Sequence, residues 1–294
     1  MAEQVTLFDV GVLALVLTWA LCWLRPDRGR ARLQGLIAPS AALASGLLVA
    51  SLVWRGLMAG HIPLTTKYEF ALAFIAASGL AYTLIGWRVG WSPLGRVALI
   101  APLLLAAYAR WGIPESQQAI RPPVPALQSI WLPVHVGTAA IAYGFFAVAF
   151  GAALPAVFTS PAGQVHAADE VGRPGGMDGD AEHPVRTQGQ PPDWPATMRI
   201  AAQWGHLALT ASLIGGAVWA QMAWGRYWGW DPKEVWTLTT WLVYTLFLHA
   251  YYRPRWRGRR IAWLALLGFA AVLFTFLGIE DLVRWTAVQS LHVF

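Results

Sequence analysis

Charged residues and cysteine are both scarce in this sequence. Charged residues occupy only 12% of the 294 positions, while hydrophobic residues occupy 57% and the mean hydropathy is +0.48. Soluble domains carry about 25% charged residues, so this composition excludes an ordinary water-soluble domain. The single cysteine, Cys22, excludes a CxxC or CxxCH motif on this chain, and with it disulfide exchange. Strand-type alternation of polar and apolar residues is also lacking.

Long apolar stretches recur instead along the whole chain. About 17–25 apolar residues cross the hydrocarbon core of a bilayer as a helix, which satisfies its own backbone hydrogen bonds. The sequence therefore predicts an all-α fold, a polytopic membrane helix bundle. About eight transmembrane helices are expected, at residues 7–24, 36–57, 68–87, 97–112, 132–158, 198–222, 235–252 and 261–279.

The arginines indicate how these helices are oriented. They cluster after the first, third, fifth and seventh spans, and loops rich in arginine stay in the cytoplasm. Both termini and the 58–67 and 113–131 loops are then expected on the outer, periplasmic side. No basic stretch precedes the first span, which predicts an uncleaved anchor. The net charge of +6 belongs mostly to these loops, so a nucleic-acid partner is not expected.

The spans and loops divide the chain into three regions. Residues 1–158 are expected to form five N-terminal transmembrane helices. Residues 159–197 are polar and rich in proline and glycine, and they predict a flexible cytoplasmic loop. Residues 198–294 are expected to form three C-terminal transmembrane helices that carry an outward-facing aromatic segment, residues 219–241.

Tryptophan is concentrated in that segment. Interfacial tryptophans usually form a belt spread over many helix ends, whereas six of the eighteen here lie within residues 219–241. Flat aromatic area beside fixed charge suits a planar ligand with acidic edges, such as haem. The candidate binding residues are Trp224, Trp228, Trp230, Asp231 and Trp236, with Arg226 and Lys233 as candidate partners of the propionates. The two cations could equally pair with Asp231 and Glu234.

The run from Asp231 to Glu234 has the pattern of a helix start. Aspartate at the N-cap, proline at the first helical position and glutamate two residues later form a capping box. His249 follows Asp231 by eighteen positions, which at ~1.5 Å per residue places it ~27 Å away along the helix. We therefore expect His249 near the cytoplasmic edge of the membrane.

Two other histidines are predicted on the same side as the tryptophans. His135 begins the fifth span and His292 follows the last one, so the two could hold haem iron from both faces. Alternatively, His135 caps a helix end and His292 belongs to a frayed tail. His61 is also expected outside, and His206 is interpreted as a packing residue.

The motifs resemble those of the CcsA (ResC) family of cytochrome c biogenesis proteins, which belongs to the haem-handling proteins with a WWD motif. The similarity rests on residues 216–236 and continues through 240–242 and 248–249. It also includes residues 60–64, 68–69, 128–135 and 291–292. It thus extends along nearly the whole chain apart from the 159–197 loop.

The resemblance implies haem b as ligand and substrate in cytochrome c maturation of the system II type. His249 matches the intramembrane histidine of the family, and His135 and His292 match the outer pair of iron ligands. No catalytic residue is implied, since the chain would act by positioning haem within a cytochrome c synthase. The implied partners are a CcsB (ResB)-like membrane protein, an apocytochrome c and a thioredoxin-like thiol reductant, in the bacterial inner membrane.

Two rival functions share many of these features. A haem exporter or carrier could hand haem to a separate lyase, but eight spans and the Asp-Pro-Lys-Glu sequence favour the synthase type. An electron-transfer subunit like cytochrome b would need histidines paired at matched depth on facing helices. The sequence predicts no second histidine at the depth of His249, which argues against that function.

Overall fold

The computed structural model describes residues 2–24, 31–158, 193–256 and 258–285, and these residues contain helices and no strands. The all-α prediction is thus confirmed. In chain order the elements are α1 (Ala2–Leu21), α2 (Ala31–Gln34), α3 (Ile37–Ala59), α4 (Lys67–Val89), α5 (Trp91–Ala98), α6 (Ile100–Ala107), η1 (Tyr108–Gly112), α7 (Glu115–Gln118), η2 (Pro125–Leu127), α8 (Trp131–Phe158), α10 (Trp194–Trp224), α11 (Pro232–Tyr251), η4 (Pro254–Trp256), α12 (Arg259–Leu273), η5 (Phe274–Gly278) and α13 (Ile279–Trp285).

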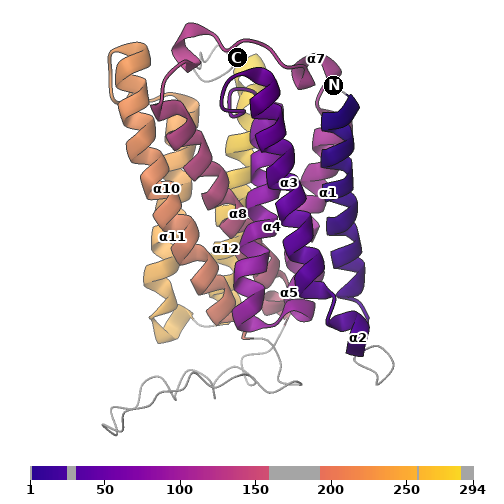
Figure 1. The fold of residues 1–294 in the computed structure, drawn as a ribbon. Coiled ribbons are helices and arrows are strands. Elements are labelled where there is room, and N and C mark those ends of the chain that lie inside the picture. The colour runs from indigo at the N-terminus through magenta and orange to yellow at the C-terminus, as the bar shows by residue number, and fades with distance from the viewer. Residues whose placement is uncertain (1, 25–30, 159–192, 257, 286–294) are drawn as a thin grey trace, which may run out of the picture.

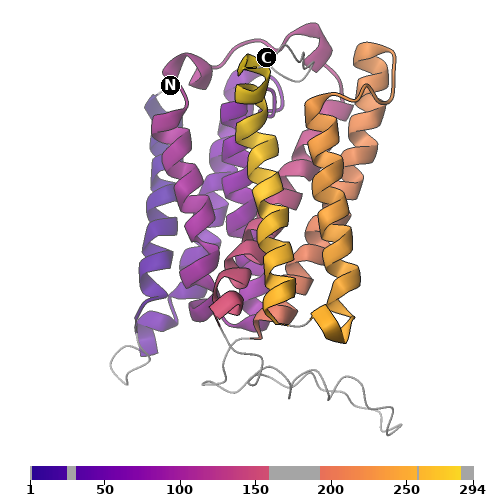
Figure 2. The ribbon, with the colours of Figure 1, turned by 180° about the vertical axis from the view of Figure 1, so that it is seen from behind.

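The long helices run side by side along one axis of the molecule (Figure 1). The helix α8 packs against α4, α5, α10 and α12, so it occupies the middle of the bundle. The start of α1, the end of α13 and the short helix α7 all lie at one end, which we call the α7 end (Figure 1). Seen from behind, the column of α12, η5 and α13 extends along the whole bundle (Figure 2).

Six helical segments are long and apolar enough to cross a membrane, and the chain is a multi-pass membrane protein. They are Ile37–Ala59, Lys67–Val89, Trp91–Gly112, Trp131–Phe158, Trp194–Trp224 and Arg259–Gly278. The apolar part of α1, Leu7–Leu21, is shorter. The twenty-residue α11 is less apolar, because its first turn contains Lys233 and Glu234 and several threonines follow. Of the eight predicted spans, those at α1 and α11 are therefore not both long and apolar enough to meet this criterion for crossing a membrane.

The surface of the bundle supports lipid as its solvent. Large apolar side chains face outward along the helices, among them Leu57 at 73%, Trp87 at 82% and Leu104 at 67% exposed. Exposed apolar area on this scale is unusual for a protein dissolved in water. Inside, small residues bring the helices together: a Cβ on Gly144 would lie 2.5 Å from the backbone of Ala77. Such contacts are typical of helices packed within a membrane.

Several helix boundaries differ from the prediction. The helix α10 begins at Trp194 rather than at 198, because Asp193 accepts a hydrogen bond from the amide of Ala196 and acts as N-cap. Residues 91–96 extend the predicted 97–112 span toward its start. Both η1 and η5 are π-helical turns within longer helices, a feature often found at functional sites.

Candidate functional site

A cavity of about 430 Å³ lies at the α7 end of the bundle. Its walls come from α4, α8, α10, α11 and η5, and the segment between η1 and α8 contributes a further wall. The polar, charged and aromatic side chains lining it are Thr65, Thr66, Lys67, Phe70, Ser116, Gln117, Arg121, His135, Tyr143, Ser212, Trp219, Tyr227, Trp228, Lys233, Glu234, Thr237, Thr275, Phe276 and Glu280.

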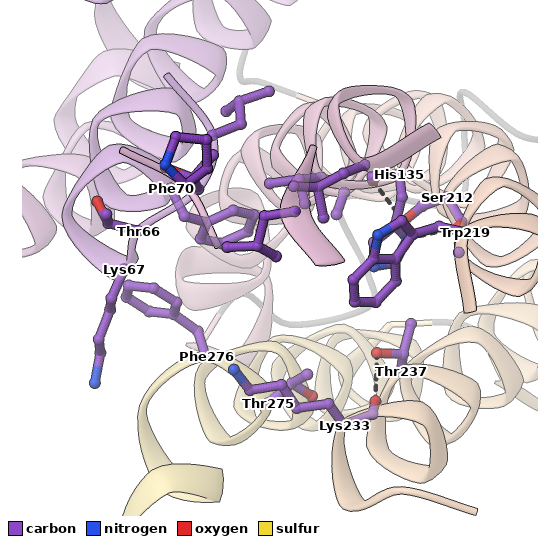
Figure 3. Close-up of a pocket in the computed structure, with 18 of the residues that line it drawn as sticks. Thr66, Lys67, Phe70, His135, Ser212, Trp219, Lys233, Thr237, Thr275 and Phe276 are labelled. Carbon is purple, nitrogen blue, oxygen red and sulfur yellow. Dashed lines mark hydrogen bonds between the residues drawn. The ribbon is translucent and has the colours of Figure 1, made fainter. Parts of the chain in front are cut away.

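His135 is held in this cavity by α10. Its Nδ1 lies 2.8 Å from the carbonyl oxygen of Ser212, and the hydroxyl of Ser212 donates to the carbonyl of His135 at 2.9 Å. A carbonyl oxygen can only accept, so Nδ1 carries a proton, and in the neutral imidazole the lone pair is on Nε2. The imidazole also stacks on Trp219, with ring centroids 6.2 Å apart and an interplanar angle of 5° (Figure 3).

Gly216 makes room for this imidazole. A Cβ at that position would lie 2.6 Å from Nδ1 and 2.7 Å from Cε1 of His135. Contacts this short do not occur, so any larger residue would displace the ring. The neighbouring Gly215 differs, because a Cβ there would lie 3.4 Å from Val134 and 3.5 Å from the amide nitrogen of His135. The sequence pattern indicated His135 but offered no reason to single out Gly216.

The tryptophans of residues 219–241 do not act as one surface. Trp219 is 1% exposed and packs with Leu127 and Leu132, while Trp224 lies edge-on against it with centroids 6.0 Å apart. Trp228 lines the cavity. Trp236 packs instead on Phe274, with centroids 4.3 Å apart. Among the four indoles predicted to bind the ligand, Trp228 is therefore the one that lines the cavity.

The two acidic residues of this segment cap α11. Glu234 Oε2 accepts from the amides of Gly229 at 2.8 Å and Asp231 at 3.1 Å. Asp231 accepts from the amide of Lys233 at 2.9 Å, and the complete capping box is present. The predicted helix start is thereby confirmed. It follows that these carboxylates hold the loop between α10 and α11 in shape.

Arg226 and Trp230 lie on the outer side of that loop. Arg226 is exposed, and its guanidinium packs against Gly229, where a Cβ would be 2.8 Å from Nε. Trp230 is 73% exposed and has φ of 58°, which bulky residues rarely adopt. Its indole meets Trp228 edge-on at 5.8 Å. Neither Arg226 nor Trp230 is among the described residues that line the cavity.

Replacing Trp230 with glycine is expected to raise the free energy of unfolding by roughly 0.5–1 kcal/mol. Left-handed backbone costs an L-residue about 1–2 kcal/mol, which exceeds the entropic cost of glycine. Thermal unfolding of the purified chain would measure the change. Trp236→Gly is the matched control and should destabilise, because that indole packs within the bundle on Phe274. A lower melting temperature for Trp230→Gly would contradict the expected relief of strain.

The positively charged residues that line the cavity include some from outside the tryptophan segment. Lys233, a candidate from the sequence, lines it, and Lys67 and Arg121 line it as well. Lys67 Nζ lies 2.7 Å from Glu280 Oε2, joining α4 to α13 across 213 positions of sequence. No sequence motif connects these two residues, so reasoning from the sequence missed them.

A second ion pair, fully buried, organises the neighbouring loops. Arg55 Nε lies 2.9 Å from Glu69 Oε1, and the two residues are 4% and 1% exposed. Arg55 also donates to the carbonyl of Gln118 in α7, at 2.8 Å. Glu69 Oε2 accepts from the amide of Thr65 at 2.8 Å and from the amide of Thr66 at 3.3 Å. The pair thus holds two loops that wall the cavity.

The remaining histidines lie elsewhere. His249 is in the last turn of α11, away from the α7 end as the helix rise predicted, and it is exposed. His206 Nε2 lies 2.8 Å from Thr245 Oγ1, and His249 Nδ1 lies 2.8 Å from the carbonyl of the same Thr245. Both histidines thus contact Thr245 from the facing helices α10 and α11, so the prediction that no second histidine lies near the depth of His249 is wrong. His61 contacts the carbonyl of Arg121 at 3.3 Å, and His292 lies outside the described residues.

Comparison with known proteins gives consistent results. A family model described as cytochrome C assembly protein matches residues 65–284. The chain is 33% identical over 286 residues to the cytochrome c biogenesis protein CcsA of Synechococcus sp. (strain RCC307), covering 93% of this chain and 90% of that protein. It is 34% identical over 258 residues to CcsA of Parasynechococcus marenigrum (strain WH8102), covering 84% and 83%.

The similarity extends to a solved structure. The structure of the cytochrome c haem lyase CcmF aligns with a TM-score of 0.61 at 20% identity, over 95% of this chain. The chain spans about half of that protein, 47% of its length. At this level of identity, the similarity concerns the fold alone.

Proposed function

Because this chain belongs to the cytochrome c assembly protein family, alongside the CcsA proteins, and so acts in cytochrome c maturation, we propose that its α7-end cavity binds haem b as substrate. The cavity would present this haem to the CxxCH motif of an apocytochrome c. Bound haem would supply the vinyl groups to which the two cysteine thiols add. The chain would contribute position, holding its substrate in register with the incoming thiols.

The observation that carries this proposal is the fixed imidazole of His135. A histidine whose Nδ1–H is held by a carbonyl oxygen presents Nε2 in one orientation, as metal-ligating histidines commonly do. The other residues present also fit haem. A cavity of about 430 Å³ is within the usual range for organic ligands. Trp228 offers an aromatic ring, and Lys67, Lys233 and Arg121 offer positive charge for two carboxylates.

We further propose that the α7 end is the periplasmic face of the inner membrane. Support comes from the arginines. Arg88 and Arg96 lie near the connection of α4 to α5, and Arg253, Arg255 and Arg260 near that of α11 to α12. Both connections are at the end of the bundle opposite α7 (Figure 1). Arginine-rich loops are retained in the cytoplasm. In this orientation α1 and α11 complete a set of eight spans. The outer iron ligands would then be His135 and His292.

His249 would belong to a second haem site near the cytoplasmic side. It is exposed on α11, where a polar ring facing lipid is costly unless another protein covers it. We propose that a CcsB (ResB)-like partner covers this face and supplies the second iron ligand. A thioredoxin-like protein would keep the apocytochrome thiols reduced. Haem would move from the site at His249 to the α7-end cavity.

Haem spectra of the purified chain test the central proposal. His135→Ala should lose the Soret signature of ligated haem at the outer site, and cytochrome c maturation should fall to background. The reason is that removal of an iron ligand leaves haem without a fixed position. Added imidazole should restore both signals if ligation is the missing role. His292→Ala is expected to behave in the same way.

His61→Ala is the matched control, since it removes a histidine at the same end that does not line the cavity. It should mature cytochrome c normally. Normal maturation in both His135→Ala and His292→Ala would refute the outer site. Normal haem loading by the wild-type complex without any attachment to apocytochrome would instead favour a carrier that serves a separate lyase.

A further inference from the structure

The ion pair between Lys67 and Glu280 differs from the structural pair beside it. In the Arg55–Glu69 pair, both oxygens of the carboxylate accept hydrogen bonds from the protein. Glu280 accepts one hydrogen bond from the described residues, that of Lys67. Both side chains are 17% exposed and both line the cavity. The carboxylate of Glu280 therefore accepts fewer hydrogen bonds than that of Glu69, and the pair can interact with a ligand in the cavity.

Lys67 is placed to hold an anion at this edge of the cavity. Its Nζ lies 5.7 Å from the ring centroid of Tyr108 and 5.8 Å from that of Phe276. Aromatic faces stabilise an ammonium group while shielding it from water, which strengthens its attraction for a carboxylate. A turn of π-helix, η5, places Phe276 there, beside Thr275.

Lys233 supplies a second ammonium group to the cavity. Lys233 lines the same cavity as Lys67 and Glu280. Asp231 is engaged in capping α11, whereas Glu280 pairs with Lys67 and lines the cavity together with both lysines. Figure 3 shows Lys233 and Lys67 on the side of the cavity that carries Phe276, with His135 and Trp219 on the other side. A planar ligand bound between these sides would have its acidic edge at the lysines.

We propose that Lys67 and Lys233 are the carboxylate-recognition residues of this cavity, and that Glu280 occupies their site as an internal counter-ion. This inference rests on the proposed function, in which the ligand carboxylates are the two haem propionates. Glu280 keeps two cations from facing each other while the cavity is empty. It also competes with the ligand, so it lowers affinity for a substrate that must later be released.

Iron-free porphyrins test the recognition of carboxylates separately from iron ligation. The probes are protoporphyrin IX, which carries two carboxylates, and its dimethyl ester, which carries none. The full-length chain in phosphatidylcholine nanodiscs would be titrated with each, and quenching of tryptophan fluorescence would give Kd. The variants are Lys67→Met and Glu280→Gln, with Lys67→Arg to retain the charge. Arg110→Met is the control, because it removes an exposed cation that does not line the cavity.

The wild type should bind the diacid more tightly than the ester. Lys67→Met should weaken diacid binding about tenfold, the effect of one hydrogen bond between charged groups, and leave ester binding unchanged. Glu280→Gln should strengthen diacid binding severalfold. Lys67→Arg should retain the preference for the diacid, and Arg110→Met should match the wild type. Ester binding also reports that each variant has folded.

The outcomes distinguish the two proposals. If neither porphyrin binds the wild type, the haem cavity itself is refuted. If both bind equally well, or if Glu280→Gln weakens diacid binding, carboxylate recognition by this pair is overturned while the cavity stands.

Discussion

Gly216→Ala is expected to lower haem affinity by about 10–100-fold and to stop cytochrome c maturation. A Cβ at this position would lie 2.6 Å from His135 Nδ1, so the imidazole must leave its place on Trp219 and its bond to Ser212. Loss of a group that orients a metal ligand typically costs this much affinity. Haem titration of the purified chain, followed by its absorption spectrum, measures the effect.

Two further variants show whether Gly216→Ala lowers haem affinity by displacing His135. Gly215→Ala adds the same methyl group one position away, at an ordinary 3.4 Å from Val134, and should bind haem normally. In a His135→Ala background, Gly216→Ala should add nothing, because the atoms it would displace are gone. Equal losses from Gly215→Ala and Gly216→Ala would show a general weakness of α10 instead.

Glu69→Gln should destabilise the chain by about 3–5 kcal/mol, because it leaves the guanidinium of Arg55 buried without a counter-charge. The loops held by the pair, at Thr65–Thr66 and at Gln118, should loosen together. Haem binding should therefore weaken even though neither Arg55 nor Glu69 lines the cavity. Thermal unfolding in detergent gives the stability change, and limited proteolysis reports on the loops.

The double variant Arg55→Met with Glu69→Gln separates charge from packing. It removes the unpaired charge and should recover much of the lost stability, as replacements of whole buried pairs often do. Its haem binding should stay weak, since the bond to Gln118 is still missing. A double variant as unstable as Glu69→Gln would show that packing, and not charge, dominates at this site.

The features predicted well from the sequence are local ones. The capping box at Asp231 and Glu234 spans only four residues, and the structure contains it as predicted. Apolar stretches predicted an all-helical membrane bundle, since length and hydropathy can be read along the chain. His249 falls in the last turn of α11 because helix rise is constant. Each of these features depends on residues that lie close together in the sequence.

The features that sequence reasoning missed depend on distant parts of the chain. Lys67 and Glu280 meet only because the starts of α4 and α13 lie beside each other. His206 reaches Thr245 because α10 packs on α11. The tryptophan segment was predicted as one platform, but Trp219 is buried, Trp228 lines the cavity and Trp236 packs on Phe274. Gly225 and Trp230, both with positive φ, shape the backbone between α10 and α11. Backbone shape of this kind leaves no periodic signal in the sequence.

The π-turn η5 separates two tasks within a single helical column. Each extra residue in such a turn rotates the rest of the helix by about 100° relative to an uninterrupted α-helix. Before the turn, α12 presents Ile261, Ala265 and Phe269 to the core of the bundle. Within and after it, Thr275, Phe276 and Glu280 face the cavity. Substitutions can therefore alter the residues that pack against neighbouring helices without altering those that face the ligand, although both sets belong to one continuous helical column.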